Sequence, residues 1–555
     1  MFRTLITFLM VAVINVAMAA DYDVIIRNGS IYDGTGAPPY VADLAITGDR
    51  LSAIGHFAAV SADLDIDASG LAVSPGFFNM LSHAHLSLIS DGRAMSDVMQ
   101  GVTFEVLSEI SLSPLTDSTA DFWSRFSNDE VEMTWRTLGE YLQTVEDNGV
   151  SVNFATFVSA ATVRMNIIGM DDVDPTPEQL DMMKSQVAEA MEDGALGLTT
   201  ALIYAPATYA ETEELIELAK VAGQYGGIYT AHMRSESNQF IESIDETLRI
   251  GREAKLPVKI HHLKAAGRPN WYKMDNAIDK IEALRREGIP VTADMHTYTA
   301  GGSGLDASMP TWVQAGGYDK WVERLKDPEI RARVKAEMAV NAQDWENLGY
   351  FAGPDGMVFL EFKSKDHMKY LGKTLAEVAA ERGQDPRDTI IDLVIEDGSR
   401  VVTAYYFLMS EENLKKQIRQ PWVMFGSDGT APAAEGKTLE SGVHPRTYGN
   451  IARLLGKYVR DENVIPMEEA IRRLSFLPAQ TLGIRERGRL APGYFADIAI
   501  FDPKTINDNS RFDDPHRYAS GVQYVLVNGV PVVSKGEHTG ATPGRAVHGP
   551  GWRQP

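Results

Sequence analysis

Residues 227–232 read GIYTAH and residues 257–264 read PVKIHHLK, and the two stretches share one pattern. In each, a short apolar run of the kind that forms a buried strand ends in histidine. A segment whose sequence predicts a helix lies before each run, for example over residues 212–225. The pattern predicts parallel strands that alternate with helices and carry polar side chains at their carboxyl ends.

Outward from these two runs, the middle of the chain holds eight strand candidates. They are Ala72-Val73, 102–107, 152–158, 195–201, 227–231, 257–260, 289–293 and 422–425. Eight β/α units predict an α/β fold, a TIM-like (β/α)8 barrel over residues 73–484. The alternation is interrupted before the eighth strand by residues 301–420, which contain segments predicted to be helical. We expect an inserted subdomain or lid there, with Gly301 to Gly304 as its hinge.

Short alternating apolar runs flank this region over residues 20–72 and 485–555. Asn-Gly, Gly-Ala-Pro-Pro and Gly-Asp pairs separate the runs near the amino terminus, as turns do between short strands. Neither end has enough strands for a domain of its own. We therefore expect one small β-sandwich built from both termini.

Composition narrows the function classes. The 555 residues include 76 acidic and 52 basic side chains, a net charge of −24, which argues against nucleic acid or an anionic membrane as partner. Cysteine is absent, which excludes disulfides, thiolate zinc sites and cysteine nucleophiles. Any bound metal must be held by histidine, aspartate and glutamate.

Residues 1–19 read as a signal peptide. Arg3 precedes an apolar run over residues 5–16, and Ala17-Met18-Ala19 has the small-residue spacing of a cleavage site. The run is shorter than the roughly 20 residues that span a bilayer. We expect an exported, periplasmic protein with no membrane association after cleavage.

Side chains that bind metals follow several of the predicted strands, at the barrel rim where active sites lie. On extended backbone, the i, i+2 pair of histidines after the first strand would point to one side. Taken singly, each residue has a structural interpretation, such as helix capping for Glu109 or an Asp-Gly turn for Asp428. Together they predict a site for one or two divalent cations. The candidates are His83, His85, Glu109, His232, His261 or His262, and Asp428.

This pattern resembles the ligand set of the amidohydrolase superfamily, and more narrowly the chain resembles the N-acyl-D-amino-acid deacylase (D-aminoacylase) family. The resemblance covers nearly all of the chain after residue 20, in family order. It implies a zinc cofactor, the composite sandwich and the insert before the eighth strand. The matching segments are SPGFFNMLSHAH (74–85), QGVTFEVLSE (100–109), GALGLTTALIYAPATYA (194–210), GGIYTAHMRSES (226–237), LPVKIHHLKAAGRPNW (256–271), DMHTYTAGGSGL (294–305), GSDG (426–429), HPRTYGNIARLLGKYVR (444–460) and RGRLAPGYFADIAIFDP (487–503).

The resemblance also assigns roles to residues. His83 and His85 match the first metal pair, His232 and His262 the later two ligands, and Asp428 the catalytic aspartate. Positions that hold the substrate carboxylate are matched by Lys264, Tyr298 and Arg446. Arg234, which follows His232, is a further substrate-binding candidate; Arg234 and Glu236 either shape the pocket or pair with each other.

Two departures from the family pattern bear on the metal. Family members commonly place a cysteine after the second strand, whereas this chain has Glu109, whose carboxylate can bridge two cations. Leu86 and Ser87 stand where Asp-Asp often follows the first histidine pair. One zinc held by Glu109, His232 and His262 is therefore an alternative to two.

The resemblance implies deacylation of N-acyl-D-amino acids, with a small N-acylated amino acid or short peptide as substrate. In the mechanism we expect, zinc activates a water and Asp428 moves its proton. The alternatives are a metal-dependent dipeptidase, a cyclic-amide hydrolase or a non-catalytic exported binding protein. The sequence leaves a homo-oligomeric state open.

Overall fold

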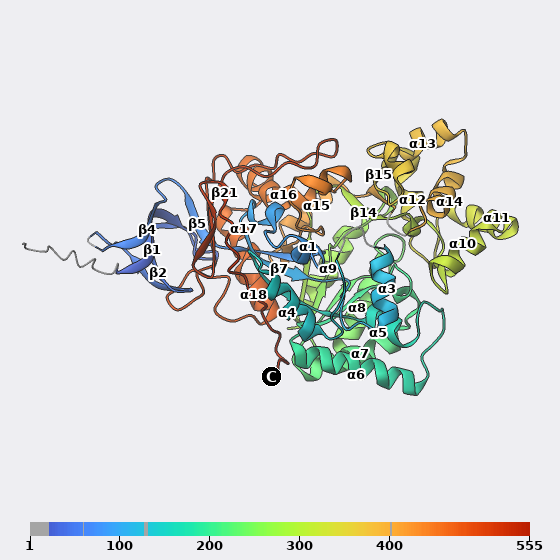
Figure 1. Ribbon diagram of the computed structural model, residues 1–555, viewed down its shortest axis with the longest axis horizontal. Helices are drawn as coiled ribbons and strands as arrows, with labels where there is room; N and C mark the ends of the chain where they lie inside the picture. The colour runs from blue at the N-terminus through green and yellow to red at the C-terminus, as the bar shows by residue number, and fades with distance from the viewer. Residues whose placement is uncertain (1–20, 59, 127–130, 400–401, 555) are drawn as a thin grey trace, which may run out of the picture.

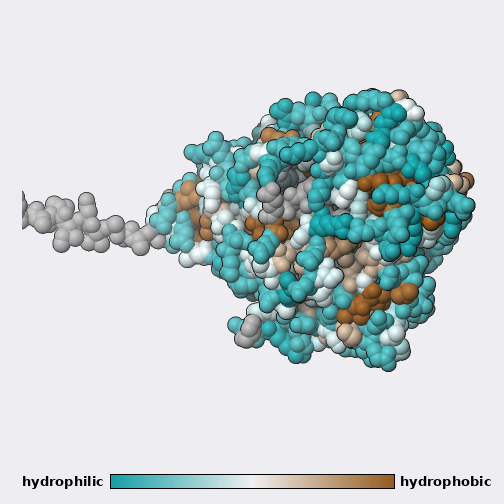
Figure 2. Space-filling view, turned by 45° about the vertical axis from the view of Figure 1, so that its right-hand side comes forward, coloured by the Kyte–Doolittle hydropathy of each residue, from teal (hydrophilic) through white to brown (hydrophobic). Residues whose placement is uncertain are grey.

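The computed structural model describes residues 21–58, 60–126, 131–399 and 402–554 (Figure 1). The predicted signal peptide, residues 1–19, lies outside the described residues. Among those that are described, no helix combines the length and apolar character needed to cross a membrane. Figure 1 shows the sandwich at the left, the barrel in the centre and the insert at the right. Figure 2 shows a mostly hydrophilic face with separate hydrophobic patches.

A parallel (β/α)8 barrel forms the centre of the described chain, as predicted. Neighbouring strands pair in parallel, and a parallel bridge between Ser82 and Gly429 links the eighth strand region to the first. Nearly every strand residue is buried, which explains the continuous apolar runs in the sequence. The barrel strands are β6 (Phe77–Ser82), β7 (Val102–Leu107), β8 (Asn153–Thr156) with β9 (Val158–Ser159), β10 (Gly197–Ala201), β11 (Ile228–His232), β12 (Val258–Ile260), β13 (Val291–Met295) and β17 (Val423–Phe425).

Helices cover the barrel and begin where the sequence places capping residues. For example, Thr176 accepts a hydrogen bond from the Gln179 backbone N–H and Pro177 opens α6. The helices outside the insert are α1 (Ser87–Ser90), α2 (Met95–Val98), α3 (Asp117–Phe126), α4 (Leu138–Asn148), α5 (Ala160–Ile167), α6 (Pro177–Asp193), α7 (Thr212–Gln224), α8 (Phe240–Ala254), α9 (Lys273–Arg286), α15 (Glu411–Ile418), α16 (Arg446–Arg453) with a π-helical turn (Leu454–Asp461), α17 (Met467–Leu474) and α18 (Phe476–Leu482).

The first predicted barrel strand was wrong. Ala72-Val73 lies in β5 (Ala72–Pro75), which pairs with β1 and β18 of the sandwich, and the barrel begins with β6. Pro75-Gly76 separates the two strands. A Cβ atom on Gly76 would lie 2.1 Å from the Thr103 hydroxyl oxygen, so only glycine allows this close crossing between the domains.

Both termini build the β-sandwich domain, as predicted. Strand β5 lies between β1 from the amino-terminal part and β18 from the carboxyl-terminal part. Asn28-Gly29, which was expected as a turn, is instead an irregularity inside β1. The other strands are β1 (Tyr22–Ile31), β2 (Tyr40–Thr47), β3 (Arg50–Gly55), β4 (Ala62–Asp67), β18 (Ile498–Phe501), β19 (Val522–Val527), β20 (Val530–Ser534) and β21 (Glu537–His538).

The insert lies between β13 and α15 and has a hydrophobic core of its own. It contains a three-stranded antiparallel sheet in the order β14-β16-β15. The glycines predicted as a hinge form strand β14, paired with β16 along its length, so that prediction was wrong. The elements are β14 (Ala300–Gly304), α10 (Tyr318–Lys326), α11 (Pro328–Met338), α12 (Leu348–Ala352), β15 (Met357–Glu361), α13 (Leu375–Arg382), α14 (Pro386–Asp397) and β16 (Thr403–Phe407).

Candidate metal centre

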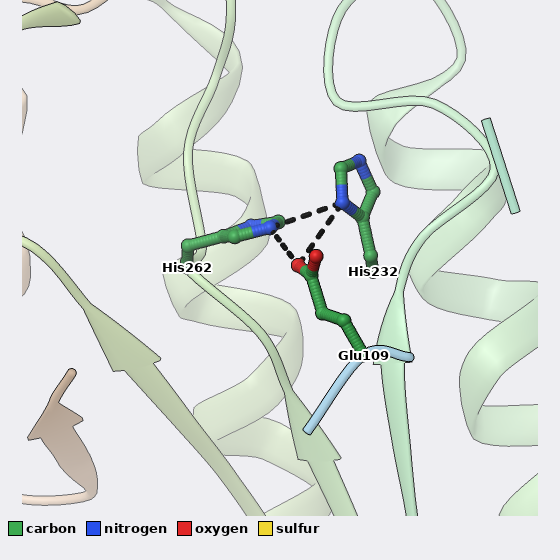
Figure 3. A group of neighbouring side chains, drawn as sticks. All are labelled: Glu109, His232 and His262. Carbon is green, nitrogen blue, oxygen red and sulfur yellow. Dashed lines mark hydrogen bonds and ion pairs between the residues drawn. The ribbon is translucent and has the colours of Figure 1, made fainter. Parts of the chain in front are cut away.

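Three predicted ligands meet at the carboxyl ends of β7, β11 and β12 (Figure 3). His232 Nδ1 lies 3.1 Å from Glu109 Oε1 and 3.0 Å from His262 Nε2. His262 Nε2 also contacts the same carboxylate oxygen. All three side chains are buried. Their ligand atoms converge on one point, the arrangement that a single cation requires.

A second group shares Glu109 and includes the end of the eighth strand. His83 Nε2 lies 3.0 Å from Asp428 Oδ1 and 3.4 Å from Glu109 Oε2. Arg446 lies 2.8 Å from the other Asp428 oxygen. The ligand atoms of His83, Glu109 and Asp428 also lie within 4.8 Å of one another, so Glu109 could bridge two cations.

Three of these residues have strained backbones. Glu109, His262 and Asp428 have φ values of 66°, 29° and 50°, in a region that residues other than glycine rarely adopt. Buried partners hold them there. The His262 N–H donates to Asp294 at 2.7 Å, and the Asp428 N–H donates to the Leu81 carbonyl at 2.9 Å. Such strain accumulates where function needs a side chain aimed at one point.

His85 is not a member of either group of ligand atoms. Strand β6 ends at Ser82, and residues 84–86 form a turn before α1, so the backbone is not extended between the two histidines. The extended-pair geometry expected from the sequence is therefore wrong. The His85 ring is buried against Tyr141, with centroids 6.3 Å apart, and it is absent from both ligand groups.

The charges of the cluster shift the titration of its members. Burial raises the pKa of Glu109, but His262 and His232 outweigh it and hold that pKa well below its usual range. Burial and Lys264 lower the pKa of His262, whereas the carboxylates of Glu236 and Glu109 raise it to about 10. Burial raises the pKa of Asp428, but the Arg446 guanidinium and the His83 ring bring it below its ordinary value. Asp428 is therefore ionised at neutral pH.

Glu236 supports the cluster from one layer further out. Its carboxylate lies 2.9 Å from His262 Nδ1, and both of its oxygens accept from Lys264 Nζ at 2.7 Å. A carboxylate behind a metal-binding imidazole fixes the ring and its tautomer. The sequence offered Glu236 only as a pocket residue or a partner of Arg234. Its spacing, four residues after His232, was the available signal.

Two predicted substrate-binding residues are directed elsewhere. Arg234 binds Glu246 at 2.9 Å and two backbone carbonyls of the η1 region (Ala207–Tyr209 and its flanks). The Tyr298 hydroxyl donates to Asp508 at 2.7 Å. Neither residue lines the cavity at the cluster, because each has these other buried partners.

A cavity of about 220 Å³ opens onto the ligands. Lys264, Arg446 and Asp428 line it together with His83, and the insert contributes Leu348 and Tyr406. Arg446 is buried. Its Nη1 pairs with Asp428 Oδ2, and its Nε has no hydrogen-bond partner among the described residues. An unpaired guanidinium donor at this depth favours a bound anion.

The donor set fits zinc. Two imidazoles and one carboxylate, with no thiolate, form the three-ligand set of catalytic zinc sites, which leave a coordination position open. The ring of His262 is fixed by the Glu236 carboxylate, as zinc-binding histidines usually are. Glu109, His232 and His262 would hold the ion, and His83 with Asp428 could complete a second position.

Comparisons with known proteins agree with this site. A model of the amidohydrolase family matches residues 65–533. D-aminoacylase of Alcaligenes xylosoxydans xylosoxydans is 31% identical over 529 residues, which cover 95% of this chain and 97% of the relative. N-acyl-D-aspartate deacylase of the same organism is 30% identical over 540 residues, 96% of each chain.

Solved structures of such relatives share the whole fold. A crystal structure of D-aminoacylase matches with a TM-score of 0.80 at 30% identity, covering 95% of this chain and all 100% of that one. N-acyl-D-glutamate deacylase from Bordetella bronchiseptica, complexed with zinc and a phosphonate mimic of the tetrahedral intermediate, matches with a TM-score of 0.79 at 28% identity, covering 95% and 99%. The chain therefore belongs to the amidohydrolase family and is a metal-dependent amidohydrolase related to the N-acyl-D-amino-acid deacylases.

Proposed function

We propose that the protein hydrolyses N-acyl-D-amino acids to a carboxylate and a free D-amino acid, with zinc as its metal. One observation carries the proposal: Asp428 lies between the ligand cluster and the buried Arg446 guanidinium. This places a proton acceptor next to a receptor for a carboxylate. The relatives named D-aminoacylase and N-acyl-D-aspartate deacylase support the substrate class and its stereochemistry.

Zinc, when bound, supplies an activated water and polarises the acyl carbonyl. The residues of the chain do the rest. Asp428 is ionised, so it can accept the proton of the attacking water and pass it to the leaving nitrogen. The Arg446 guanidinium, with its Nε unpaired, binds the substrate carboxylate and so positions the amide at the ligands. The His83 ring, 3.0 Å from Asp428 Oδ1, orients the Asp428 carboxylate.

We also propose that the protein is exported to the periplasm and that residues 1–19 are removed. The residue pattern of this segment supports the proposal. Amino-terminal sequencing of the secreted protein tests it, with cleavage expected after Ala19 or Ala20. Recovery of the protein with Met1 from the cytoplasm would contradict it.

The catalytic proposal is tested with matched pairs of N-acetyl-D- and N-acetyl-L-amino acids. The protein is reconstituted with zinc, and release of free amine is measured. We expect release from the D-enantiomers. If neither enantiomer reacts while zinc is bound, dipeptides and hydantoins are tested next, and turnover of either would assign the dipeptidase or cyclic-amide alternative. Metal binding without hydrolysis of any of these would favour a binding protein.

A further inference from the structure

Apart from its charged end, the substrate cavity is lined by aliphatic side chains. Ile110, Ile203, Leu348 and Leu408 form this apolar wall. Leu348 begins α12 and Leu408 follows β16, so the insert supplies half of the wall. Three of the four side chains are buried: Ile203, Leu348 and Leu408 are 8%, 6% and 3% exposed.

The tyrosines in the lining add apolar ring surface rather than free hydroxyls. The Tyr204 hydroxyl is 2.8 Å from Ser303 Oγ. The Tyr406 hydroxyl donates to the Gly304 carbonyl at 2.9 Å. A ligand therefore meets the rings of these two residues, whose polar ends are already occupied.

The charges in the lining accommodate one carboxylate. Lys264 and Arg446 are its cations among the described residues, against the carboxylates of Glu109, Glu236 and Asp428. Lys264 is already paired with both oxygens of Glu236. Arg446 pairs with Asp428 through Nη1 and retains an unpaired donor on Nε. A second substrate carboxylate would be buried with no further lysine or arginine in this lining to pair with it, which is unfavourable.

We propose that the preferred substrates carry one carboxylate and an aliphatic or aromatic side chain, and that Leu348 is a specificity-determining residue. N-acyl-D-amino acids such as those of leucine, methionine and phenylalanine fit the apolar wall, and the acidic substrates named for two of the relatives do not. This inference rests on the proposed deacylase function and selects among its substrates.

Side-chain preference is measured on the intact, zinc-loaded protein. N-acetyl-D-leucine, N-acetyl-D-phenylalanine, N-acetyl-D-alanine, N-acetyl-D-glutamate and N-acetyl-D-aspartate are compared by kcat/KM. We expect leucine to exceed glutamate by about 100-fold or more, and alanine to fall about 10-fold below leucine because it leaves the wall uncovered.

The outcomes separate the two proposals. If none of the five substrates is hydrolysed, the deacylase function fails. If all are hydrolysed but glutamate or aspartate matches or exceeds leucine, the deacylase function stands and the apolar preference is overturned.

Leu348→Ala tests the specificity-determining residue. The variant should lose about 10-fold in kcat/KM for N-acetyl-D-leucine and stay within about two-fold for N-acetyl-D-alanine. Leu393→Ala is the matched control, because Leu393 is buried in the core of the same insert and does not line the cavity. An equal loss on both substrates in Leu348→Ala, or the same leucine-to-alanine change in Leu393→Ala, would overturn the assignment.

Discussion

At the residue scale, the two oxygens of Asp428 have different partners. Oδ1 faces His83 at 3.0 Å and Oδ2 faces Arg446 at 2.8 Å, outside the group formed by Glu109, His232 and His262. Proton transfer and metal binding should therefore be separable. In Asp428→Asn, kcat should fall by about 100- to 10,000-fold, because an amide cannot accept the proton. Metal analysis of the same sample should find most of the zinc retained. An active variant would exclude Asp428 as the proton acceptor.

Arg446 provides a second separable effect. Its Nη1 has a 2.8 Å ion pair with Asp428, and its Nε is without a partner among the described residues. Arg446→Ala should raise KM for N-acetyl-D-amino acids by about 10- to 100-fold, the value of a charge-assisted hydrogen bond to a carboxylate. Arg446→Lys keeps the charge but lacks the planar guanidinium, so its KM should lie between those of the wild type and Arg446→Ala. Steady-state kinetics of both variants check this, and unchanged kinetics in Arg446→Ala would remove the residue from the site.

The sequence predicted which strand ends carry the candidate site. Glu109, His232, His262 and Asp428 lie at or within three residues of the end of a barrel strand, and the structure brings them together. His85, Tyr298 and Arg234 lie equally close to strand ends, but turns and long-range partners set the direction of their side chains. The pairing of Tyr298 with Asp508, 210 positions away, has no local signature.

At the element scale, α2 and β7 bury two carboxyl groups against each other. Asp97 accepts from Asn79 Nδ2 at 3.1 Å, and the same amide donates to Ser427 Oγ at 2.8 Å, next to Asp428 in the chain. Burial raises the pKa of Asp97 to about 7, against the hydrogen bonds from Ser96 and Asn79. Burial and the charge of Asp97 also raise the pKa of Glu105.

This pair should make stability fall with increasing pH. The folded pKa of Asp97 lies above its unfolded value of 3.8, so its contribution is complete below about pH 4 and is lost as the pH rises through about 7. Relative to wild type, Asp97→Asn should gain up to about 4 kcal/mol between pH 4 and pH 8, since each pKa unit corresponds to about 1.4 kcal/mol. Urea unfolding at both pH values measures this. The exposed Asp355→Asn is the control, and parallel pH profiles for wild type and Asp97→Asn would contradict the prediction.

Most strands were predictable because burial on both faces leaves continuous apolar runs. The run 102–107 coincides with β7, and 195–201 contains β10. The error at Ala72-Val73 has a simple cause. Strands β5 and β6 form one apolar stretch broken only by Pro75-Gly76, and which sheet each joins depends on β18, more than 400 residues later. Local patterns identify a strand but not its partner.

At the scale of the whole molecule, the carboxyl-terminal tail fastens the barrel at the end opposite the site. The Phe154 N–H donates to the Arg545 carbonyl at 3.0 Å, and the Val547 N–H donates to the Phe154 carbonyl at 2.7 Å. The Gly549 N–H donates to the carbonyl of Gly194, before β10, at 2.8 Å. The metal ligands lie at the carboxyl ends of the strands. The tail contacts that stabilise the barrel and the residues that carry the chemistry therefore lie at opposite ends of it.

A chain that ends at Gly540 should therefore lose stability and keep its chemistry. Removal of the tail breaks these hydrogen bonds and one from the Gly544 N–H to the Val150 carbonyl, at about 0.5–1.5 kcal/mol each. For a chain of this size, the melting temperature should fall by roughly 2–5 °C. At 25 °C, kcat/KM should stay within about two-fold of the full-length value, because no tail residue lines the cavity. A chain that ends at Arg553, which keeps the Arg553 N–H bond to the Glu192 carbonyl, is the matched control. Differential scanning calorimetry and steady-state kinetics decide the outcome: lost activity at an unchanged melting temperature would mean that the tail serves the site and not the base of the barrel.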